Sequence, residues 1–441
     1  MNKKNSVVLR PLDNCQVETP PEIISFVWKI LKKYRKNSGN VIDFGAGDGR
    51  FSIDGSYNKY TGIEIDEDKK TINHFSKKAE LKYGCMLDVH DLYDLSIGNP
   101  PYYRHHDINR AWRKKAIEVI SNETLTPINE LCNLFVYFIW MSILRTKEDG
   151  IISLIIPYEW VSRPSVKHLR DYVKKNKWAV DVYRFEDVDN IFPDVLTTAS
   201  LTIINKSVSD GRWNYYNVDK DLNITSRKGQ TDTGKEVLPY IVGGEIKAQR
   251  GFSPGSQKIF VLTEGIRVRH GIGKKDVIPC VTSFRNIPVD VSILNEKNFK
   301  KFFIDNKAKC WLLDTEKKVS DTVKAYLDSI PEDGKNTWTC QNRDIWYKYK
   351  IPKIPKILFS SGFVRIRPKM MKNSVGAVAV GSVFGIISEK RIPRSNMLLE
   401  YLKSYDFEGR VVHHAGSLRK IEVNQMNWVI NQYYNKNREN L

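Results

Sequence analysis

The first half of the chain alternates short apolar, β-branched runs with longer stretches that carry apolar residues at helical spacing. The runs that predict strands share an end at a glycine, acidic, asparagine or proline residue: 41–44, 60–64, 95–98 and 151–156. Helices are predicted at 22–33, 69–78, 129–145 and 165–176. Such alternation is typical of a parallel sheet with helices on both faces. Two more strands, at 179–185 and 199–205, predict that the sheet finishes in an antiparallel hairpin at one edge.

The pattern changes in the second half. From about residue 237 the chain shows short β-like runs that glycine and proline interrupt, as at 258–263, 356–360 and 377–387. This pattern predicts a mixed α+β domain. The polar, glycine-containing stretch 221–236 between the two halves predicts a linker. We therefore expect a first domain at 1–220 and a second at 237–441.

Charge is divided unequally between these halves. The 441 residues carry a net charge of +19, of which residues 1–220 contribute +3 and residues 221–441 contribute +16. Residues 351–394 hold nine basic side chains and one acidic side chain. A basic second domain next to a nearly neutral first one indicates a polyanionic partner, with a solvated basic face as the plain alternative.

Composition excludes several classes of protein. An apolar content of 41% excludes disorder as the main state. The longest uncharged apolar stretch has 11 residues, whereas a transmembrane helix needs about 20. No signal-peptide pattern follows the first residues. The six cysteines are far apart and include no Cys-x-x-Cys pair, which argues against disulfides and structural zinc. The sequence predicts a cytoplasmic protein without a membrane partner or a bound metal.

A glycine-rich turn follows the first predicted strand. Residues 45–49 read Gly-Ala-Gly-Asp-Gly, and missing side chains there let the backbone approach a ligand. Glu64 ends the next strand about 20 residues later, where a carboxylate can accept both ribose hydroxyls of a nucleoside. Asp43 adds a carboxylate that suits an ammonium better than a pyrophosphate. S-adenosylmethionine, a nucleoside that carries an amino acid, fits both demands.

The segment Asn99-Pro100-Pro101-Tyr102 ends the strand at 95–98. Prolines have no N–H, so the Pro100 carbonyl can face outward as an acceptor, and the Asn99 side chain offers a second acceptor. Two acceptors can take both hydrogens of an NH₂ group and so direct its lone pair at an electrophilic methyl. Tyr102 offers a flat surface for the planar group that bears the amine.

These motifs resemble the S-adenosylmethionine-dependent DNA adenine-N6 methyltransferases of the gamma arrangement in restriction–modification systems. In that arrangement a Thr-Pro helix start precedes the glycine-rich turn, the Asn-Pro-Pro-Tyr segment follows it, and the target-recognition domain is C-terminal. The chain has this order, beginning at Thr19-Pro20. The resemblance covers roughly 15–205. It implies an α/β fold with a Rossmann-like methyltransferase sheet at 1–220 and a DNA target-recognition domain at 237–441.

The resemblance also implies roles for single residues. Thr19 would hold the methionine end of the cofactor, which Asp43, Gly45 and Gly47 would surround. Glu64 would bind the ribose, and Ile65 would contact the adenine ring. Asp88 would accept from the cofactor's adenine N6, with Val89 beside the ring where the family usually has Phe. With the catalytic residues Asn99, Pro100, Pro101 and Tyr102, Phe192 would stack on a target base turned out of the duplex.

DNA contacts are expected from basic residues. Arg104 lies two residues after Tyr102 and could contact the phosphate beside the extruded base. Two runs, 267–275 and 363–367, alternate basic and apolar residues, so on a strand the basic side chains would share one face. The residues concerned are Arg267, Arg269, Lys274, Arg365 and Arg367.

The leading hypothesis is a site-specific DNA adenine-N6 methyltransferase that acts on double-stranded DNA, for which a monomer suffices. A cognate restriction endonuclease would be a separate chain. One alternative is methylation of cytosine N4 in DNA, whose enzymes more often have Ser at the position of Asn99. Two others are methylation of ribosomal RNA and methylation of a protein glutamine. A non-catalytic nucleic-acid-binding module is an alternative of another class.

Overall fold

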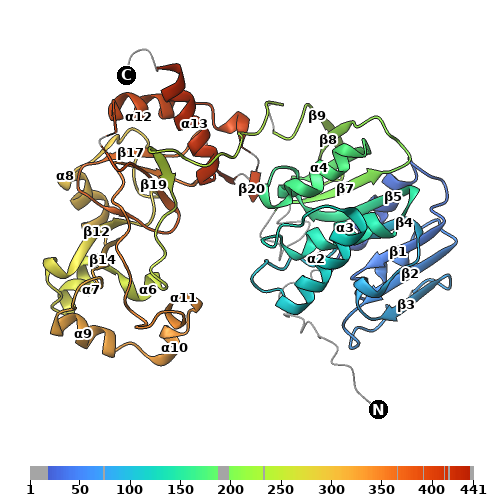
Figure 1. Cartoon of the computed structure of the whole chain (residues 1–441), viewed down its shortest axis with the longest axis horizontal. Helices are drawn as coiled ribbons and strands as arrows, with labels where there is room; N and C mark the ends of the chain where they lie inside the picture. The colour runs from blue at the N-terminus through green and yellow to red at the C-terminus, as the bar shows by residue number, and fades with distance from the viewer. Residues whose placement is uncertain are drawn as a thin grey trace. The chain divides into compact units, whose positions relative to one another are not determined.

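The computed structural model divides the chain into two compact units (Figure 1). The first comprises Met1–Val237 and Val412–Ser417, and the second comprises Leu238–Val411 and Leu418–Leu441. The structure describes residues 18–72, 75–186, 198–231, 234–364, 366–390, 392–411, 413–415 and 418–437. Within this described part, no helix is both long and apolar enough to cross a bilayer.

A nine-stranded sheet forms the centre of the first unit. In spatial order its strands are β3 (Ala79–Tyr83), β2 (Lys59–Glu64), β1 (Asn40–Phe44), β4 (Tyr93–Gly98), β5 (Thr146–Pro157), β7 (Ala199–Asn205), β6 (Ala179–Phe185), β8 (Trp213–Val218) and β9 (Ile224–Arg227). Strands β3 to β5 run parallel, and β7 lies antiparallel between β5 and β6. Because β1, β2 and β4 run parallel, their carboxyl ends meet at the same edge of the sheet.

Helices cover both faces of this sheet. Along β1, Val41 belongs to the core under α1 (Pro21–Leu31), and Ile42 belongs to the opposite core. That second core also holds side chains of α2 (Arg110–Thr124), α3 (Leu134–Arg145) and α4 (Lys167–Lys175). Successive strand residues point to opposite faces, so apolar residues at both positions bury the sheet on both sides. The α/β fold class predicted from the sequence is confirmed.

Two predicted elements of the first unit are wrong. No helix forms in the described part of 69–78. The stretch 221–236 is not simply a linker, because Ile224–Arg227 form β9 and pair antiparallel with β8. Asp219 makes the turn between them by accepting from the backbone of Asp221 and Asn223. The β6–β7 hairpin is therefore followed by two more strands and does not form the edge.

The second unit mixes small sheets with short helices. One sheet has the order β10 (Lys247–Gln249), β19 (Val383–Ile387), β15 (Ile357–Ser360), β17 (Met370–Asn373), β13 (Ile293–Leu294). Another has the order β11 (Val261–Thr263), β14 (Lys309–Leu313), β12 (Val277–Val281), β18 (Val378–Ala379). β16 (Gly362–Phe363) pairs antiparallel with β21 (Leu418–Lys420), and β20 (His413–Ala415) falls in the first unit.

Eight α-helices, with two 3₁₀ helices and a π-helix, complete the described part of the second unit. The α-helices are α6 (Gln257–Phe260), α7 (Glu264–Arg269), α8 (Glu296–Phe299), α9 (Asp321–Asp328), α10 (Glu332–Lys335), α11 (Trp338–Gln341), α12 (Ser395–Ser404) and α13 (Val423–Lys436). Two apolar cores lie within this unit. One is built around β11, β12 and β14, and the other packs α12 and α13 against β15 and β19.

Candidate active site

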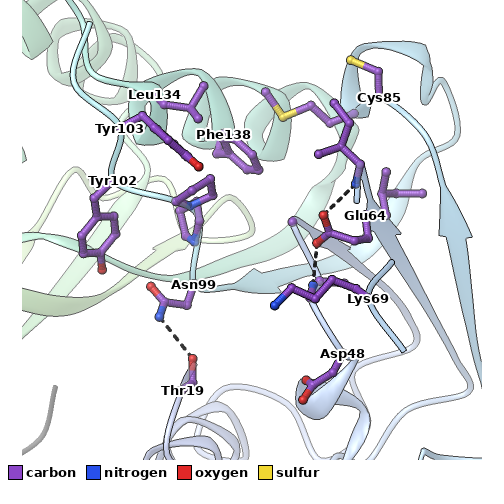
Figure 2. A pocket seen from close by; sticks show the side chains of 18 of the residues that line it. Thr19, Asp48, Glu64, Lys69, Cys85, Asn99, Tyr102, Tyr103, Leu134 and Phe138 are labelled. Atoms are coloured by element: carbon purple, nitrogen blue, oxygen red, sulfur yellow. Dashed lines mark hydrogen bonds between the residues drawn. The ribbon is translucent and has the colours of Figure 1, made fainter. Parts of the chain in front are cut away.

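A cavity of about 310 Å³ opens at the carboxyl ends of β1, β2 and β4. Several residues singled out from the sequence line it together: Thr19, Gly45, Gly47, Glu64, Ile65, Asn99, Pro100, Pro101 and Tyr102. They come from segments far apart in the chain, and the parallel order of the strands brings them to one edge. The structure therefore joins the glycine-rich turn and the Asn-Pro-Pro-Tyr segment in one site (Figure 2).

The glycine-rich turn forms one wall of the cavity. Gly45 and Gly47 have φ values of +73° and +58°, a region that side-chain-bearing residues seldom adopt. A Cβ at Gly45 would lie 3.1 Å from the Phe138 ring. At Gly47 a Cβ would meet no protein atom within 4 Å, so it would take up space in the cavity itself. The missing side chain thus leaves room for a ligand against the backbone.

Glu64 is fixed by the backbone around it. Its Oε2 accepts from Gly47 N at 2.8 Å, and its Oε1 accepts from Ile65 N at 2.8 Å and from Asp66 N at 2.9 Å. The residue is only 6% exposed, yet it lines the cavity. A carboxylate has about four acceptor positions, so Oε2 keeps capacity for a further donor. This arrangement suits hydroxyl groups of a ligand.

The two polar atoms of the Asn99 amide differ in their hydrogen bonding. Its Nδ2 donates to Thr19 Oγ1 at 3.2 Å. Its Oδ1 is buried and has no hydrogen-bond partner among the described residues. A buried acceptor without a partner is costly, and such atoms in native proteins are commonly completed by a ligand. Asn99 thus offers a free acceptor at the cavity, as the sequence predicts.

Aromatic and apolar side chains form a further wall of the cavity, next to the Asn-Pro-Pro-Tyr segment. The Tyr102 hydroxyl donates to Ile155 O at 3.0 Å, and the Tyr102 ring meets Phe135 edge-on with centroids 6.4 Å apart. Burial raises the pKa of Tyr102, so its phenol stays protonated. Figure 2 shows Tyr103, Leu134 and Phe138 on the same side of the cavity, where they suit a planar ring.

Arg50 joins the segment before α1 to the glycine-rich turn. Its guanidinium donates to Asp48 through Nε at 2.9 Å and Nη2 at 2.6 Å, and through Nη1 to the Thr19 carbonyl at 2.9 Å. Glu18 pairs with the same Nη2 at 2.9 Å. Asp48, the foremost of these contacts, raises the pKa of Arg50. The result is a charged clip that holds Thr19 at the cavity wall.

Asp43 lies beneath the cavity and does not line it. The residue is 1% exposed, and its Oδ2 accepts from the Tyr60 hydroxyl at 2.6 Å. Its Oδ1 has no partner among the described residues. Burial raises the pKa of Asp43 to about 8, against the opposing effect of the Tyr60 hydrogen bond. Asp43 supports the turn from below, whereas the expected role was direct contact with the cofactor.

Asp88 and Val89, which the resemblance places at the cofactor's adenine, are not among the residues that line the cavity. Asp88 closes the 3₁₀ turn Met86–Asp88, and its exposed carboxylate accepts from Lys115 Nζ at 2.8 Å. Strand β3 ends at Tyr83, and the residues that follow it directly line the cavity. The 3₁₀ turn after them carries Asp88 outward. Cys85 and Met86 take the expected place, and Cys85 accepts from Trp112 Nε1 at 3.3 Å.

Further lining residues were missed by the sequence analysis. They are Glu18, Ala46, Asp48, Arg50, Phe51, Ile63, Lys69, Lys70, Gly84, Cys85, Met86, Tyr103, Asp107, Ile108, Trp112, Leu134 and Phe138. For Cys85 and Met86 the end of β3 was a usable signal. For Leu134 and Phe138 none existed, because α3 is apolar on nearly every side and no polar stripe marks the cavity. Phe192, expected to stack on the target base, lies outside the described residues.

The basic residues expected to contact DNA have different surroundings. Residues 267–275 form no strand, because Thr263 caps α7 by accepting from Ile266 N. Arg267 is consequently turned inward, where it pairs with Glu264 at 2.7 Å and donates to the Ile272 carbonyl. Lys274 lies 4.0 Å from the centroid of the Trp311 ring. Arg104, Arg269, Lys274 and Arg367 are exposed, and Arg365 lies outside the described residues.

Two models of known protein families match the chain. Residues 29–192 match the Eco57I restriction-modification methylase model, and residues 241–408 match the C-terminal domain of the Type II methyltransferase M.Eco57I. Together the two matches cover most of the chain and include the strands around the cavity. The chain belongs to the restriction–modification methyltransferases. Its nine-stranded sheet is the methyltransferase fold of this family.

Individual relatives agree with this family. The methyltransferase is 22% identical to the Type II methyltransferase M.AccI of Acinetobacter calcoaceticus over 77% of this chain and 69% of that protein. It is 21% identical to M.XamI of Xanthomonas campestris pv. amaranthicola over 75% of this chain and 66% of that protein. The matched part thus spans about two thirds of each relative's length.

A solved structure supports the fold of the methyltransferase. The Type IIL restriction-modification enzyme MmeI, in complex with DNA, superposes with a TM-score of 0.56 at 10% identity. The match covers 91% of this chain and 64% of that one. At this identity the likeness shows the fold alone.

Proposed function

We propose that the chain transfers a methyl group from S-adenosylmethionine to N6 of an adenine turned out of duplex DNA. The observation that carries this proposal is the buried, unpartnered Oδ1 of Asn99 at a cavity that also holds Glu64 and the glycine-rich turn. An acceptor for an amine thus lies at the same cavity as a carboxylate that can accept from ribose hydroxyls. The family and its Type II relatives support DNA as the substrate.

The cavity residues fit the proposed cofactor. Glu64 keeps acceptor capacity on Oε2 for ribose hydroxyls, and Gly47 leaves space against the backbone. Ile65, Cys85 and Met86 offer apolar contacts for an adenine ring. When bound, S-adenosylmethionine supplies an electrophilic methyl group on a positively charged sulfur.

The chain's residues would then act on the target amine. Asn99 Oδ1 and the Pro100 carbonyl would accept its two hydrogens, which withdraws the nitrogen lone pair from the ring and directs it at the methyl group. Tyr102 would contact the planar ring. Extruding a base costs a few kcal/mol, and aromatic contacts offset part of this cost. No side chain is needed as a strong base before attack, because the neutral amine attacks first and loses its proton afterwards.

The two units would divide the work. We propose that the first unit binds the cofactor and performs the transfer, and that the second unit recognises the DNA sequence. The net charge of +16 over residues 221–441 supports a polyanionic partner for that part of the chain. We propose that the protein acts on double-stranded DNA in the cytoplasm. A monomer suffices to methylate one base.

Transfer of labelled methyl groups to unmethylated DNA, ribosomal RNA and protein tests this proposal. We compare the wild type with Asn99→Ala and with Asn58→Ala, an exposed asparagine at the amino end of β2, away from the cavity. Label should enter DNA with the wild type and Asn58→Ala, and the rate should fall at least about 100-fold with Asn99→Ala. Label that enters only RNA or protein contradicts DNA as the substrate.

A further inference from the structure

Trp338 is an exposed tryptophan at the start of α11. It is 77% exposed, whereas the other nine tryptophans of the chain are buried or half-buried. Tryptophan has a large apolar surface, which proteins usually bury in a core or use to contact a partner. Its indole is therefore an available contact for a partner of the second unit.

The structure of α11 holds this indole outward. Cys340, in the same helix, is fully buried and lies against Gly255, where a Cβ would come within 2.8 Å of its Sγ (Figure 1 shows α11 with α6, which follows Gly255). Residues two positions apart on a helix point about 200° apart, so Trp338 faces away from the core that Cys340 enters. Thr337 caps the turn by accepting from Cys340 N at 3.3 Å. The exposure of Trp338 thus follows from the local fold.

The segment after α11 is anchored on α6 by other side chains. The Trp346 ring packs on the Phe260 ring of α6 with centroids 5.7 Å apart. The Arg343 guanidinium lies 6.0 Å from the centroid of the same ring and donates to the Pro254 carbonyl at 2.9 Å. These residues serve the core of the second unit. Trp338 is by contrast an exposed ring on an anchored support.

Two lysines next to this support have no acidic partner among the described residues. Lys258 is exposed on α6, and the Lys309 ammonium, from β14, donates to the Gln257 carbonyl at 2.5 Å. Burial and the nearby Lys258 lower the pKa of Lys309, because both disfavour a second positive charge there. Two like charges without a neutralising carboxylate favour an anion, and the phosphates of nucleic acid are such anions.

We infer that Trp338 stacks on a nucleobase of the bound DNA while Lys258 and Lys309 contact its phosphates. The inference rests on the proposed function, because it takes DNA as the partner of the second unit. An aromatic ring next to basic side chains is a common arrangement for holding a base and the backbone together. In a duplex a base face is accessible only where a base step opens, so Trp338 acts as a wedge at such a step. It adds affinity without adding charge.

Affinity and its salt dependence test this contact. Trp338→Ala should lower the affinity for duplex DNA about 10- to 100-fold, and Trp338→Phe should retain most of it. The slope of log affinity against log salt should keep its wild-type value in Trp338→Ala, whereas Lys258→Ala should reduce its magnitude by about 0.9. Val242→Ala removes another exposed apolar side chain of the second unit and should bind like the wild type. Wild-type affinity in Trp338→Ala, measured by fluorescence anisotropy, would overturn the inference.

Collisional quenching by acrylamide gives a readout that needs no turnover. As the most exposed tryptophan, Trp338 should dominate the quenching of the free protein. Duplex DNA should remove this component from the wild type, and Trp338→Phe should lack it with or without DNA. Unchanged quenching of a wild type that binds DNA would contradict stacking by Trp338.

Other partners give different results. A wild-type dimer that Trp338→Ala converts to a monomer in sedimentation would assign the ring to a second copy of the chain and would also overturn the inference. A wild type that binds no duplex DNA contradicts the proposed function itself.

Discussion

Asp43 shows how a single buried carboxyl group makes stability depend on pH. It lies under the glycine-rich turn, where burial raises its pKa to about 8. Because this value exceeds the ordinary pKa of about 4, the folded protein keeps a proton that the unfolded chain releases between these pH values. The free energy of unfolding should therefore fall from about pH 4 to about pH 8, by at most about 1.4 kcal/mol per pH unit, and level off above.

Replacing Asp43 with asparagine isolates this effect. The asparagine amide would stay neutral at every pH and could still accept from the Tyr60 hydroxyl, so Asp43→Asn should lack that part of the pH slope. Urea unfolding at pH 5, 7 and 8.5 measures the free energy of unfolding of each variant. Asp221→Asn, at an exposed position, is the control and should keep the wild-type slope. The same slope in Asp43→Asn and the wild type would contradict a raised pKa.

Site residues could be predicted from the sequence where a motif is local. Asn99, Pro100, Pro101 and Tyr102 are consecutive, and their chemistry follows from residue type, so they reach the cavity as expected. Asp88 is not among the lining residues, because β3 ends before it and a 3₁₀ turn carries it into solvent, so its role toward the cofactor stays a prediction. The Arg50 clip joins segments 31 residues apart, and no spacing rule encodes such a contact.

At the scale of the element, the glycine-rich turn combines backbone strain with space for the ligand. Gly47→Ala should destabilise the protein by about 1 kcal/mol, because φ is +58°, and should weaken S-adenosylhomocysteine binding at least about tenfold. Gly211→Ala is the matched control, since φ is +69° there and a Cβ would meet its nearest atoms at 3.8 Å. It should show a similar loss of stability with unchanged affinity, measured by denaturation and calorimetry. Equal affinities of the two variants would refute the role of Gly47.

Elements were predicted well where periodicity and burial agree. Strands β1, β2 and β4 have apolar residues toward both faces, and their bounds follow from the pattern. The helix predicted at 69–78 does not form in the described part of that segment, although apolar residues occur there at helical spacing. The run 267–275 was misread because alternating basic residues are typical of a strand, whereas the Thr263 cap and the Arg267–Glu264 pair stabilise a short helix here, which puts Arg267 and Arg269 on different sides.

At the scale of the whole molecule, the asymmetric charge predicts how DNA binding responds to salt. Residues 221–441 carry a net charge of +16, and each neutralised phosphate contributes about −0.9 to the slope of log affinity against log salt. We expect a slope of about −4 or steeper for a duplex between 50 and 300 mM KCl, measured by fluorescence anisotropy. Binding of S-adenosylhomocysteine without DNA should change little over the same range. A slope near zero would contradict DNA binding through the basic half.

The identity of the methylated nucleoside tests the central claim most directly. Unmethylated DNA is incubated with the protein and labelled S-adenosylmethionine, digested to nucleosides and separated, with Asn99→Ala in parallel. The account predicts label in N6-methyladenine with the wild type and its loss with Asn99→Ala. Label in N4-methylcytosine, or label in N6-methyladenine that Asn99→Ala leaves unchanged, would contradict it.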